Sequence, residues 1–348
     1  MKRIFTCLPI LLASLLPSSC TLVDHVIPDP EPIVYVSGFD VSNLGYEGKY
    51  WKNGASVILP KAASSISIEP LSIAVSGNDV HVVGFEGNAK FQTIGRYWKN
   101  GVVTQLDGVP GILNEVVTSG NDVYIAGVGY APDSSSTSAT YWKNGKSVKL
   151  DNAVHGEAEA IAISKNDVYI GGYTFTYLPG ARTIATYWKN GIAIPLEDGS
   201  KFTSVKSIAV AGNDVHAVGY VVNDSTSNNI GRYWKNGVKT LLTGGEKSFN
   251  LHVKVSGGDV YISGNDEISP GRYRAKYWKN GIPTILDDAG ASSTDIRGLY
   301  IVNNDVYVTG VSLYPAGWVA KYWKNGIPVN LSDGTTSAHP TSIFVVPQ

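Results

Sequence analysis

Few residues in this chain have the types and spacing that chemistry requires. Its six histidines show no HExxH or other metal-ligand spacing. His252 and Glu115 stand at equivalent positions just before two repeated strands, and they form the best acid–base pair available. Carboxylate pairs such as Glu157 with Glu159 fall in loops, where the sequence does not fix their separation. No nucleophile elbow, phosphate-binding glycine loop, dinucleotide fingerprint or sialidase-type Asp-box occurs, so we assign no catalytic residue and expect no metal or cofactor.

Six aspartates recur inside nearly identical turns and could suggest a ring of metal ligands: Asp79, Asp122, Asp167, Asp214, Asp259 and Asp305. Each would lie in a different turn of the fold, so their carboxylates could not converge on one ion. We predict instead that they stabilise those turns, because short polar side chains bond locally to the backbone. His81 and His216 replace a tyrosine that five other repeats carry, which indicates packing roles.

The first 32 residues predict export and anchoring. Both cysteines lie within residues 1–20, so the rest of the chain contains no internal disulfide and no cysteine zinc site. A basic start, an apolar run and small residues before Cys20 are typical of a secretory signal. Its end, Leu16-Pro17-Ser18-Ser19-Cys20, resembles a bacterial lipobox, which implies a lipid on Cys20; Pro17 departs from the usual pattern, and an ordinary signal peptide is the alternative. Residues 21–32, with three prolines, would form a short extended tether.

Composition and charge narrow the class of protein. The formal charge is -1 and no long run of one sign occurs, so we expect no nucleic-acid partner. Glycine, tyrosine and tryptophan are abundant, β-branched residues occur throughout, and methionine occurs once, which together favour β structure. No apolar stretch after residue 20 approaches membrane-spanning length, so we expect the remainder to be soluble and monomeric.

The pentapeptide Tyr-Trp-Lys-Asn-Gly dominates the sequence. It occurs seven times, with its tryptophan at Trp51, Trp98, Trp142, Trp188, Trp234, Trp278 and Trp323. The spacing averages about 45 residues, which suits one four-stranded propeller blade. The tripeptide that contains the repeated aspartate keeps the same spacing, and a truncated copy of the residues that follow it begins at Val34.

The repeat from Ser207 to Leu242 divides into four strands. These are "SIAVA", "VHAVGY", "GRYWK" and "VKTLL", which we call the first, second, third and fourth strand. Asn236-Gly237 between the last two is a strong hairpin signal, because both central residues of a type I′ turn need positive φ. Alternation along the third strand puts Tyr97 and Lys99 on one side and Trp98 on the other, so the rings can fill the space between successive blades.

The two ends of the chain predict how the ring closes. The N-terminal repeat supplies a second, third and fourth strand but no first, and the C-terminal "TSIFVVPQ" aligns with a first strand. We therefore predict an all-β domain over residues 33–348, a seven-bladed β-propeller with four antiparallel strands per blade, closed by the C-terminal strand. The first strand of each repeat would line the central channel. An alternative division begins each blade at the third strand and makes Val34–Gly38 an outermost closing strand.

The order of these elements resembles WD40-like and NHL-like propellers, in which the first strand of each repeat lines the channel. The resemblance rests on "VKSIAVAGNDVHAVGY" followed by "YWKNG", and it extends from Ile33 to Gln348 at the level of pattern. The Gly-His and Trp-Asp signatures of WD40 repeats are absent. The pentapeptide is also similar to the aromatic-Trp-x-Asn-Gly core of repeats in bacterial extracellular proteins. That likeness implies a secreted propeller and no particular activity.

A four-stranded meander gives the ring two different faces. The turns between first and second strands, and between third and fourth, fall on one face, the short-turn face. The other connections differ from blade to blade and fall on the opposite face, the variable-loop face, where a rigid scaffold can present them for function. Aromatic rings among polar residues suit glycan or protein surfaces. The candidate ligand-binding residues there are Tyr46, Phe91, Tyr130, Phe175, Tyr177, Tyr273, Tyr314 and Trp318; alternatively, these rings cover the hydrophobic ends of their own blades.

We predict a secreted, lipid-anchored propeller that acts as a non-enzymatic binding or scaffold module at the bacterial cell envelope, with the outer membrane as the expected location. Its ligand would be a glycan or a protein on the variable-loop face, and its membrane contact would be the N-terminal lipid alone. Two alternatives stay open. One is a lyase or hydrolase at the channel mouth, built on His252 and Glu115, and the other is a structural surface protein without a discrete site.

Overall fold

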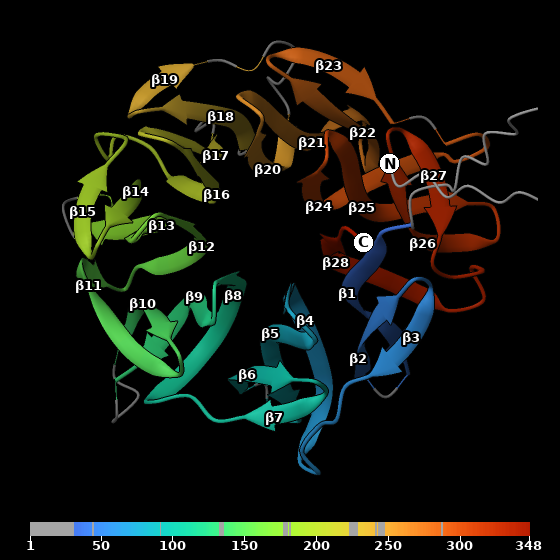
Figure 1. Ribbon diagram of the computed structural model, residues 1–348, viewed down its shortest axis with the longest axis horizontal. Coiled ribbons are helices and arrows are strands. Elements are labelled where there is room, and N and C mark those ends of the chain that lie inside the picture. Colours follow the sequence, from blue (N-terminus) through green and yellow to red (C-terminus); the bar gives the residue numbers. More distant parts are fainter. Residues whose placement is uncertain are drawn as a thin grey trace, which may run out of the picture.

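The computed structural model describes residues 31–348 except 44, 91, 132–135, 177–179, 181, 223–228, 241, 243–247 and 287. These residues form twenty-eight β-strands in seven four-stranded antiparallel sheets around a central axis (Figure 1). The chain is therefore an all-β, seven-bladed β-propeller, which confirms the fold predicted from the repeat. None of the described residues belongs to a helix that is long and apolar enough to cross a membrane. The predicted leader and residues 21–30 of the predicted tether lie outside the described residues.

The strands of each blade follow the predicted order, from the axis outwards. The first strands are β28 (Ser337–Val346), β4 (Ser65–Ser76), β8 (Val109–Ser119), β12 (Glu157–Ser164), β16 (Thr203–Ala211), β20 (Ser248–Ser256) and β24 (Ser293–Val302). The second strands are β1 (Ile33–Ser42), β5 (Asp79–Asn88), β9 (Asp122–Tyr130), β13 (Asp167–Thr176), β17 (Asp214–Val222), β21 (Asp259–Ser269) and β25 (Asp305–Tyr314). We number the blades 1 to 7 in this order.

Two further strands complete each blade towards the rim. The third strands are β2 (Gly45–Lys52), β6 (Thr93–Lys99), β10 (Thr137–Lys143), β14 (Arg182–Lys189), β18 (Asn229–Lys235), β22 (Arg272–Lys279) and β26 (Gly317–Lys324). The fourth strands are β3 (Ala55–Ile58), β7 (Val102–Thr104), β11 (Lys146–Val154), β15 (Ile192–Pro195), β19 (Val238–Thr240), β23 (Ile282–Ile285) and β27 (Ile327–Asn330). The first strand is innermost in every blade, so the alternative division with Val34–Gly38 outermost is wrong.

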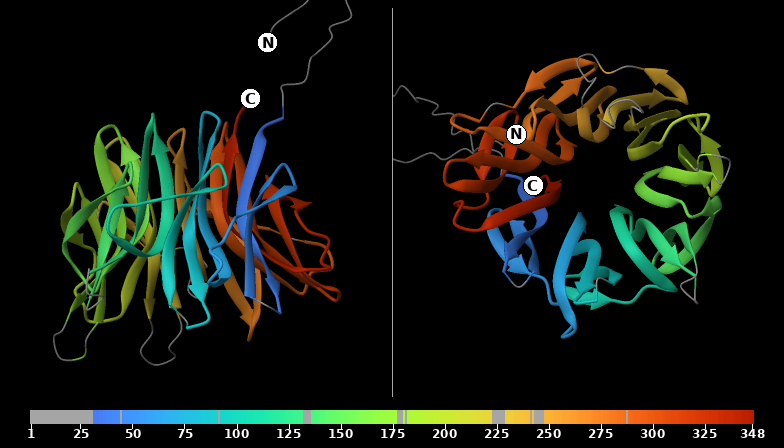
Figure 2. Two further views of the ribbon diagram at one scale, coloured as in Figure 1. Left: turned by 90° about the horizontal axis from the view of Figure 1, so that it is seen from below. Right: turned by 180° about the vertical axis from the view of Figure 1, so that it is seen from behind.

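Blade 1 joins the two ends of the chain. Strand β28 pairs with β1, with Ile343 opposite Val36 and Val345 opposite Val34. The C-terminal strand therefore closes the ring as predicted. Ile33 stands opposite Val346, so β1 begins and β28 ends where the other blades have the turn between first and second strands. Both ends of the described chain leave from the short-turn face (Figure 2, left).

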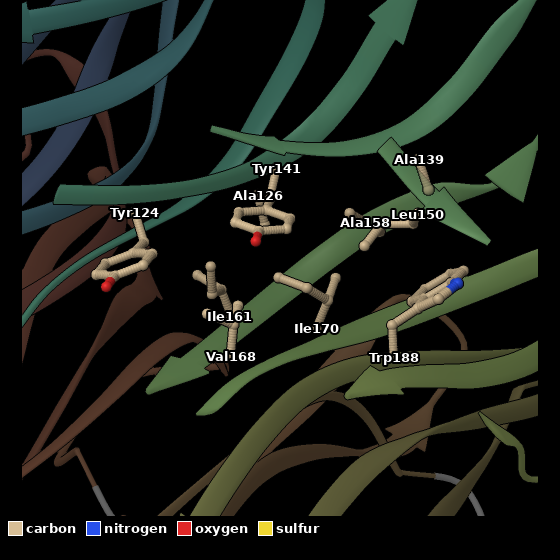
Figure 3. Close-up of a cluster of buried hydrophobic side chains, with 10 residues drawn as sticks. All are labelled: Tyr124, Ala126, Ala139, Tyr141, Leu150, Ala158, Ile161, Val168, Ile170 and Trp188. Atoms are coloured by element: carbon tan, nitrogen blue, oxygen red, sulfur yellow. The ribbon is translucent and has the colours of Figure 1, made fainter. Parts of the chain in front are cut away.

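The pentapeptide aromatics pack between blades. At the interface of blades 3 and 4, Tyr124 and Tyr141 meet Ile161, Ile170 and Trp188 (Figure 3). Trp188 is fully buried, and its indole N–H donates to the carbonyl oxygen of Asp151 at 2.7 Å, in the strand that precedes its blade. The tyrosine of one blade and the tryptophan of the next thus occupy one core, which confirms the packing predicted from alternation along the third strand.

The repeated aspartate and the pentapeptide asparagine hold two turns together on the short-turn face. In blade 2, the Asn100 side-chain amide donates to Asp79 Oδ1 at 2.8 Å and accepts from the Val80 N–H at 2.8 Å. Lys99 Nζ lies 2.7 Å from Asp79 Oδ2. Asn100 has a φ of 52°, as the predicted turn requires. We call this arrangement the turn clip, and it recurs at Asp122, Asp167, Asp214, Asp259 and Asp305.

The turn clip predicts how stability depends on pH. Hydrogen bonds from Lys99 and Asn100 lower the pKa of Asp79 below its ordinary value of 3.8, and equivalent bonds lower the pKa of Asp122, Asp167, Asp214 and Asp259. A carboxyl whose pKa is depressed by folding stabilises the fold above its unfolded pKa and loses that effect as pH falls. We therefore expect the free energy of unfolding to decrease below about pH 4 in urea titrations. The Asp79→Asn variant should show a shallower decrease, and an unchanged slope would contradict the role of the clip.

Candidate functional site

Every first strand carries an irregularity at the same level of the ring, and β4 and β8 each carry a second one nearer their start. The pairing with the second strand shifts register in all seven blades, which is the signature of a β-bulge. In six blades a single residue is left unpaired there and lines the central channel: Leu71, Asn114, Glu159, Lys206, Arg297 and Thr341. A bulge redirects a side chain, so this shared irregularity decides which residues enter the channel.

A glycine of the second strand faces each bulge, and in six blades a Cβ there would collide with a backbone carbonyl oxygen of the first strand. In blade 2 a Cβ on Gly84 would lie 2.0 Å from the carbonyl oxygen of Glu69, and in blade 5 a Cβ on Gly219 would lie 1.9 Å from that of Ser204. In the six blades that contain the repeated aspartate, this glycine is always the fifth residue after it. This spacing is a sequence signal from which the bulge could have been predicted. The division of the repeat into four strands did not take it into account.

The seven first strands enclose a cavity of about 380 Å³ on the axis. Its lining includes the cations Lys206, Lys254 and Arg297 together with the carboxylates Glu115 and Glu159. Glu115 Oε1 of blade 3 lies 3.5 Å from Lys254 Nζ of blade 6, although two blades separate them in the ring. This ion pair crosses the channel and links strands that are far apart in the sequence.

Glu115 and His252 both line this cavity, as the channel hypothesis requires. The second carboxylate oxygen of Glu115 accepts a hydrogen bond from the Ile161 N–H at 2.8 Å, so the group is held on both sides. Burial, then the nearby charges of Lys254 and Arg297, lower the pKa of His252 to about 4. An imidazole with so low a pKa is uncharged at neutral pH and is a weak general base.

The other channel charges are paired between or within blades. Lys206 of blade 5 is hydrogen-bonded to Glu159 of blade 4. Burial raises the pKa of Glu159, and although burial alone would lower the pKa of Lys206, the Glu159 carboxylate raises it. Arg297 lies 2.5 Å from Asp295 Oδ2. Among the described residues, no group of three or more histidine, cysteine or acidic side chains could hold a metal ion.

Six of the eight candidate aromatic residues are described, and all six are half-buried. Tyr46 stacks on Phe39 of the same blade with ring centroids 4.8 Å apart, and Tyr273 lies edge-on to Phe249 at 4.9 Å. The ring of Tyr130 packs directly against Gly111: a Cβ added to Gly111 would lie 2.9 Å from that ring. The other two candidates, Phe91 and Tyr177, lie outside the described residues, as does the predicted lipidation site Cys20.

The remaining candidates lie on blades 4 and 7. Phe175 is edge-on to His155 with centroids 6.5 Å apart. Tyr314 and Trp318 flank the turn between β25 and β26, where Trp318 stands opposite Leu313. The Tyr314 hydroxyl accepts a hydrogen bond from Lys321 Nζ at 2.8 Å, and burial raises its pKa. These contacts show what supports the rings of Phe175 and Tyr314; a role of the three residues in ligand binding stays a prediction.

Comparison with known proteins defines the class of this chain through its fold. No family model matches it, and no curated protein is similar to it. The β-propeller domain of the Trilobed protease from Pyrococcus furiosus is similar, with a TM-score of 0.53 and 11% identity over 88% of this chain and 96% of that chain. The acylaminoacyl peptidase from Pyrococcus horikoshii has a TM-score of 0.51 and 12% identity over 88% of this chain and 52% of that chain.

At these identities the likeness shows the β-propeller fold alone. The Pyrococcus furiosus domain is described as having an open velcro topology. In this chain β28 pairs with β1, so one blade is built from both ends. The chain is thus a β-propeller whose ring is closed by a strand.

Proposed function

We propose that this chain is a secreted, lipid-anchored propeller that binds a glycan or a protein at the cell envelope and catalyses no reaction. The observation that supports this proposal is the difference between the two faces of the ring. The short-turn face repeats one turn clip in six blades, whereas the loops of the opposite face differ in length and composition. Variable loops on a rigid scaffold are the usual place for recognition.

The position of the chain ends fits an anchored module. Residues 21–32 would connect a lipid on Cys20 to β1, which begins on the short-turn face. Twelve extended residues span about 40 Å at most. A lipid on Cys20 would therefore hold the short-turn face towards the outer membrane and leave the variable-loop face free for a ligand.

A lyase or hydrolase in the channel has weaker support. Glu115 is engaged by Lys254 and by the Ile161 N–H, and the low pKa of His252 weakens it as a base. An enzyme would need at least one of these groups free to exchange a proton near neutral pH. A protein that only binds a ligand needs no such proton-exchanging group, so it is compatible with the observed contacts of Glu115 and His252.

A glycan array probed with the purified protein and its Trp318→Ala variant tests the binding face. We expect glycan binding by the wild type and about a tenfold weaker signal for the variant, because a planar ring supplies much contact area. Ile282→Ala is the matched control, since Ile282 is 72% exposed at the rim beside the short-turn face. Loss of binding in the control but not in Trp318→Ala would contradict the assignment of faces. Binding to envelope proteins but to no glycan would identify the ligand as a protein.

Replacing Cys20 with alanine in bacteria that express the full chain tests the proposed lipid anchor. We expect the wild type in the detergent-soluble membrane fraction with a lipid-sized increase in mass, and the Cys20→Ala variant in the soluble fraction or retained with its leader. A wild-type protein without the added lipid mass would mean that the leader is an ordinary signal peptide. That result would not affect the test of the variable-loop face by the glycan array.

A further inference from the structure

Five of the seven blades carry a cation at one position of the third strand, buried in two blades and half-buried in the other three. This position stands opposite the bulge glycine of the second strand, immediately before the pentapeptide tyrosine. It is occupied in chain order by Lys49, Arg96, Thr140, Thr186, Arg232, Lys276 and Lys321. A cation buried among packed blades requires a counter-charge.

Four of the five cations have a carboxylate partner. Three partners lie on the second strand, two residues after the glycine: Asp40 binds Lys49, Glu86 lies 3.2 Å from Arg96, and Asp266 binds Lys276. In blade 7 the partner is Asp288, in the connection that leads into the blade. The pattern is therefore a largely buried ion pair that four blades build in similar ways.

Blade 5 lacks the partner. Arg232 stands opposite Gly219, and the position two residues later is Val221, which is 5% exposed. The Nε of Arg232 is buried and has no hydrogen-bond partner in the part of the chain that the structure describes. A guanidinium left in this state carries a desolvation cost that an anion would offset.

Arg232 faces a polar pocket of about 250 Å³ formed by blade 5 and the connection that leads into it. Lys201, Lys239, Ser200 and Thr203 also line it, and Val221 is the single apolar member. These residues belong to the connection before β16 and to the blade 5 strands behind it, which places the pocket towards the variable-loop face.

Both acidic residues of the pocket already accept hydrogen bonds or pair with a cation inside the protein. Glu197 accepts from the Trp234 indole N–H at 3.2 Å and lies 3.7 Å from Lys239. Asp198 accepts from the Ser200 N–H at 2.9 Å. After the Glu197–Lys239 pair is set aside, Arg232 and Lys201 face one carboxylate, so the pocket has an excess of positive charge.

We propose that this pocket binds the carboxylate or sulfate group of an acidic sugar. The Arg232 guanidinium offers parallel N–H donors whose geometry matches a carboxylate or sulfate oxygen pair. The Ser200 hydroxyl supplies a donor, and the Asp198 carboxylate, which keeps lone pairs beyond its bond to the Ser200 N–H, supplies acceptors for the sugar hydroxyls. The inference rests on the proposed binding function and narrows its glycan ligand to an anionic one.

The pocket favours a sugar over an acidic peptide. Its volume is below the range of pockets that take drug-sized ligands, so it accommodates one ring or one charged group. Donors and acceptors are mixed around the wall, which suits a molecule whose hydroxyls do both. An extended acidic peptide would instead require a longer groove with several cations.

Calorimetry with glucuronate, glucose and sulfate tests the proposal on the whole protein. We expect glucuronate to bind with a dissociation constant of about 1 mM and glucose to bind far more weakly, because charge-assisted hydrogen bonds supply most of the affinity. Arg232→Gln should weaken glucuronate binding by about tenfold or more. Arg272→Gln removes an exposed charge from the same face and should change nothing.

Val221→Glu separates binding from folding. It places a carboxylate where blade 2 has Glu86, in register to pair with Arg232 as Glu86 pairs with Arg96. We expect this variant to keep the wild-type melting temperature or exceed it, and to lose glucuronate binding. Undiminished glucuronate binding in both variants would overturn the proposal, as would equal binding of glucose and glucuronate.

The outcomes keep the two proposals apart. Array binding of neutral glycans that depends on Trp318 but not on Arg232 would leave the proposed function standing and overturn the anionic pocket. Arg232-dependent binding of an acidic peptide more tightly than glucuronate would overturn the choice of a sugar. Glucuronate binding that needs Arg232 supports the pocket even where Trp318→Ala has no effect.

Discussion

Removal of residues 337–348 is expected to abolish the cooperative unfolding transition of this protein. The deletion removes β28, the first strand of blade 1, and leaves β1 as an unpaired edge at the channel. Ile343 and Val345 are 4% and 0% exposed and share a core with Val36 and Trp51. Each buried aliphatic side chain contributes about 1.5–3 kcal/mol, and total stabilities are about 5–15 kcal/mol. Loss of these two side chains alone therefore removes about 3–6 kcal/mol, a large share of the total, and loss of the nine-position ladder to β1 adds to it.

Circular dichroism melts and size-exclusion chromatography measure this result. A variant that lacks only Pro347 and Gln348, which follow β28, is the matched control and should melt like the wild type. A synthetic peptide of residues 337–348 added in trans should restore the transition, because the groove for β28 is formed by the rest of blade 1 and its neighbours. A truncated chain that keeps the wild-type melting temperature would show that the strand closure is dispensable.

Gly84→Ala is the second change with a large expected effect. A Cβ at this position would lie 2.0 Å from the carbonyl oxygen of Glu69 and 2.8 Å from the Cα of Pro70, both backbone atoms of the bulge. Neither can move without displacing β4, so we expect a loss of about 3 kcal/mol in the free energy of unfolding. Urea denaturation at neutral pH measures the loss.

The same strand offers the control. Gly87 lies three residues further along β5, and the nearest atom to a Cβ there is 3.9 Å away. We expect Gly87→Ala to be neutral or slightly stabilising, because alanine restricts the unfolded chain. Equal losses in the two variants would mean that the bulge does not require glycine. Because the bulge directs residues into the channel, the Gly84→Ala result also bears on how the channel lining is positioned.

The sequence predicted the architecture because each blade repeats the same local signals. The tryptophan spacing, the Asn-Gly turns and the C-terminal match to a first strand were sufficient to establish the number of blades and the closure. The first strands are longer than predicted, and β16 begins at Thr203 rather than Ser207. The bulge explains this difference, because an extra residue interrupts the alternation from which strand boundaries are read.

The candidate sites were harder to predict because they depend on contacts between blades. The pair of Glu115 with Lys254 exists only once the ring is closed, and no local pattern connects the two. Arg232 is similar: its sequence context is that of Arg96, and only the absence of a carboxylate at Val221 distinguishes it. A comparison of the repeats position by position, with burial in mind, could have found that difference.

The joining of both chain ends in blade 1 has a mechanical consequence. Strand β1 is paired through eight positions to β2 and nine to β28. Tension on the chain ahead of Ile33, directed away from the short-turn face, pulls along β1 and loads both ladders in shear, so that their hydrogen bonds resist together. Tension across the strand would open them one at a time. A propeller held by its N-terminus is thus attached through the geometry in which a β-sheet is strongest.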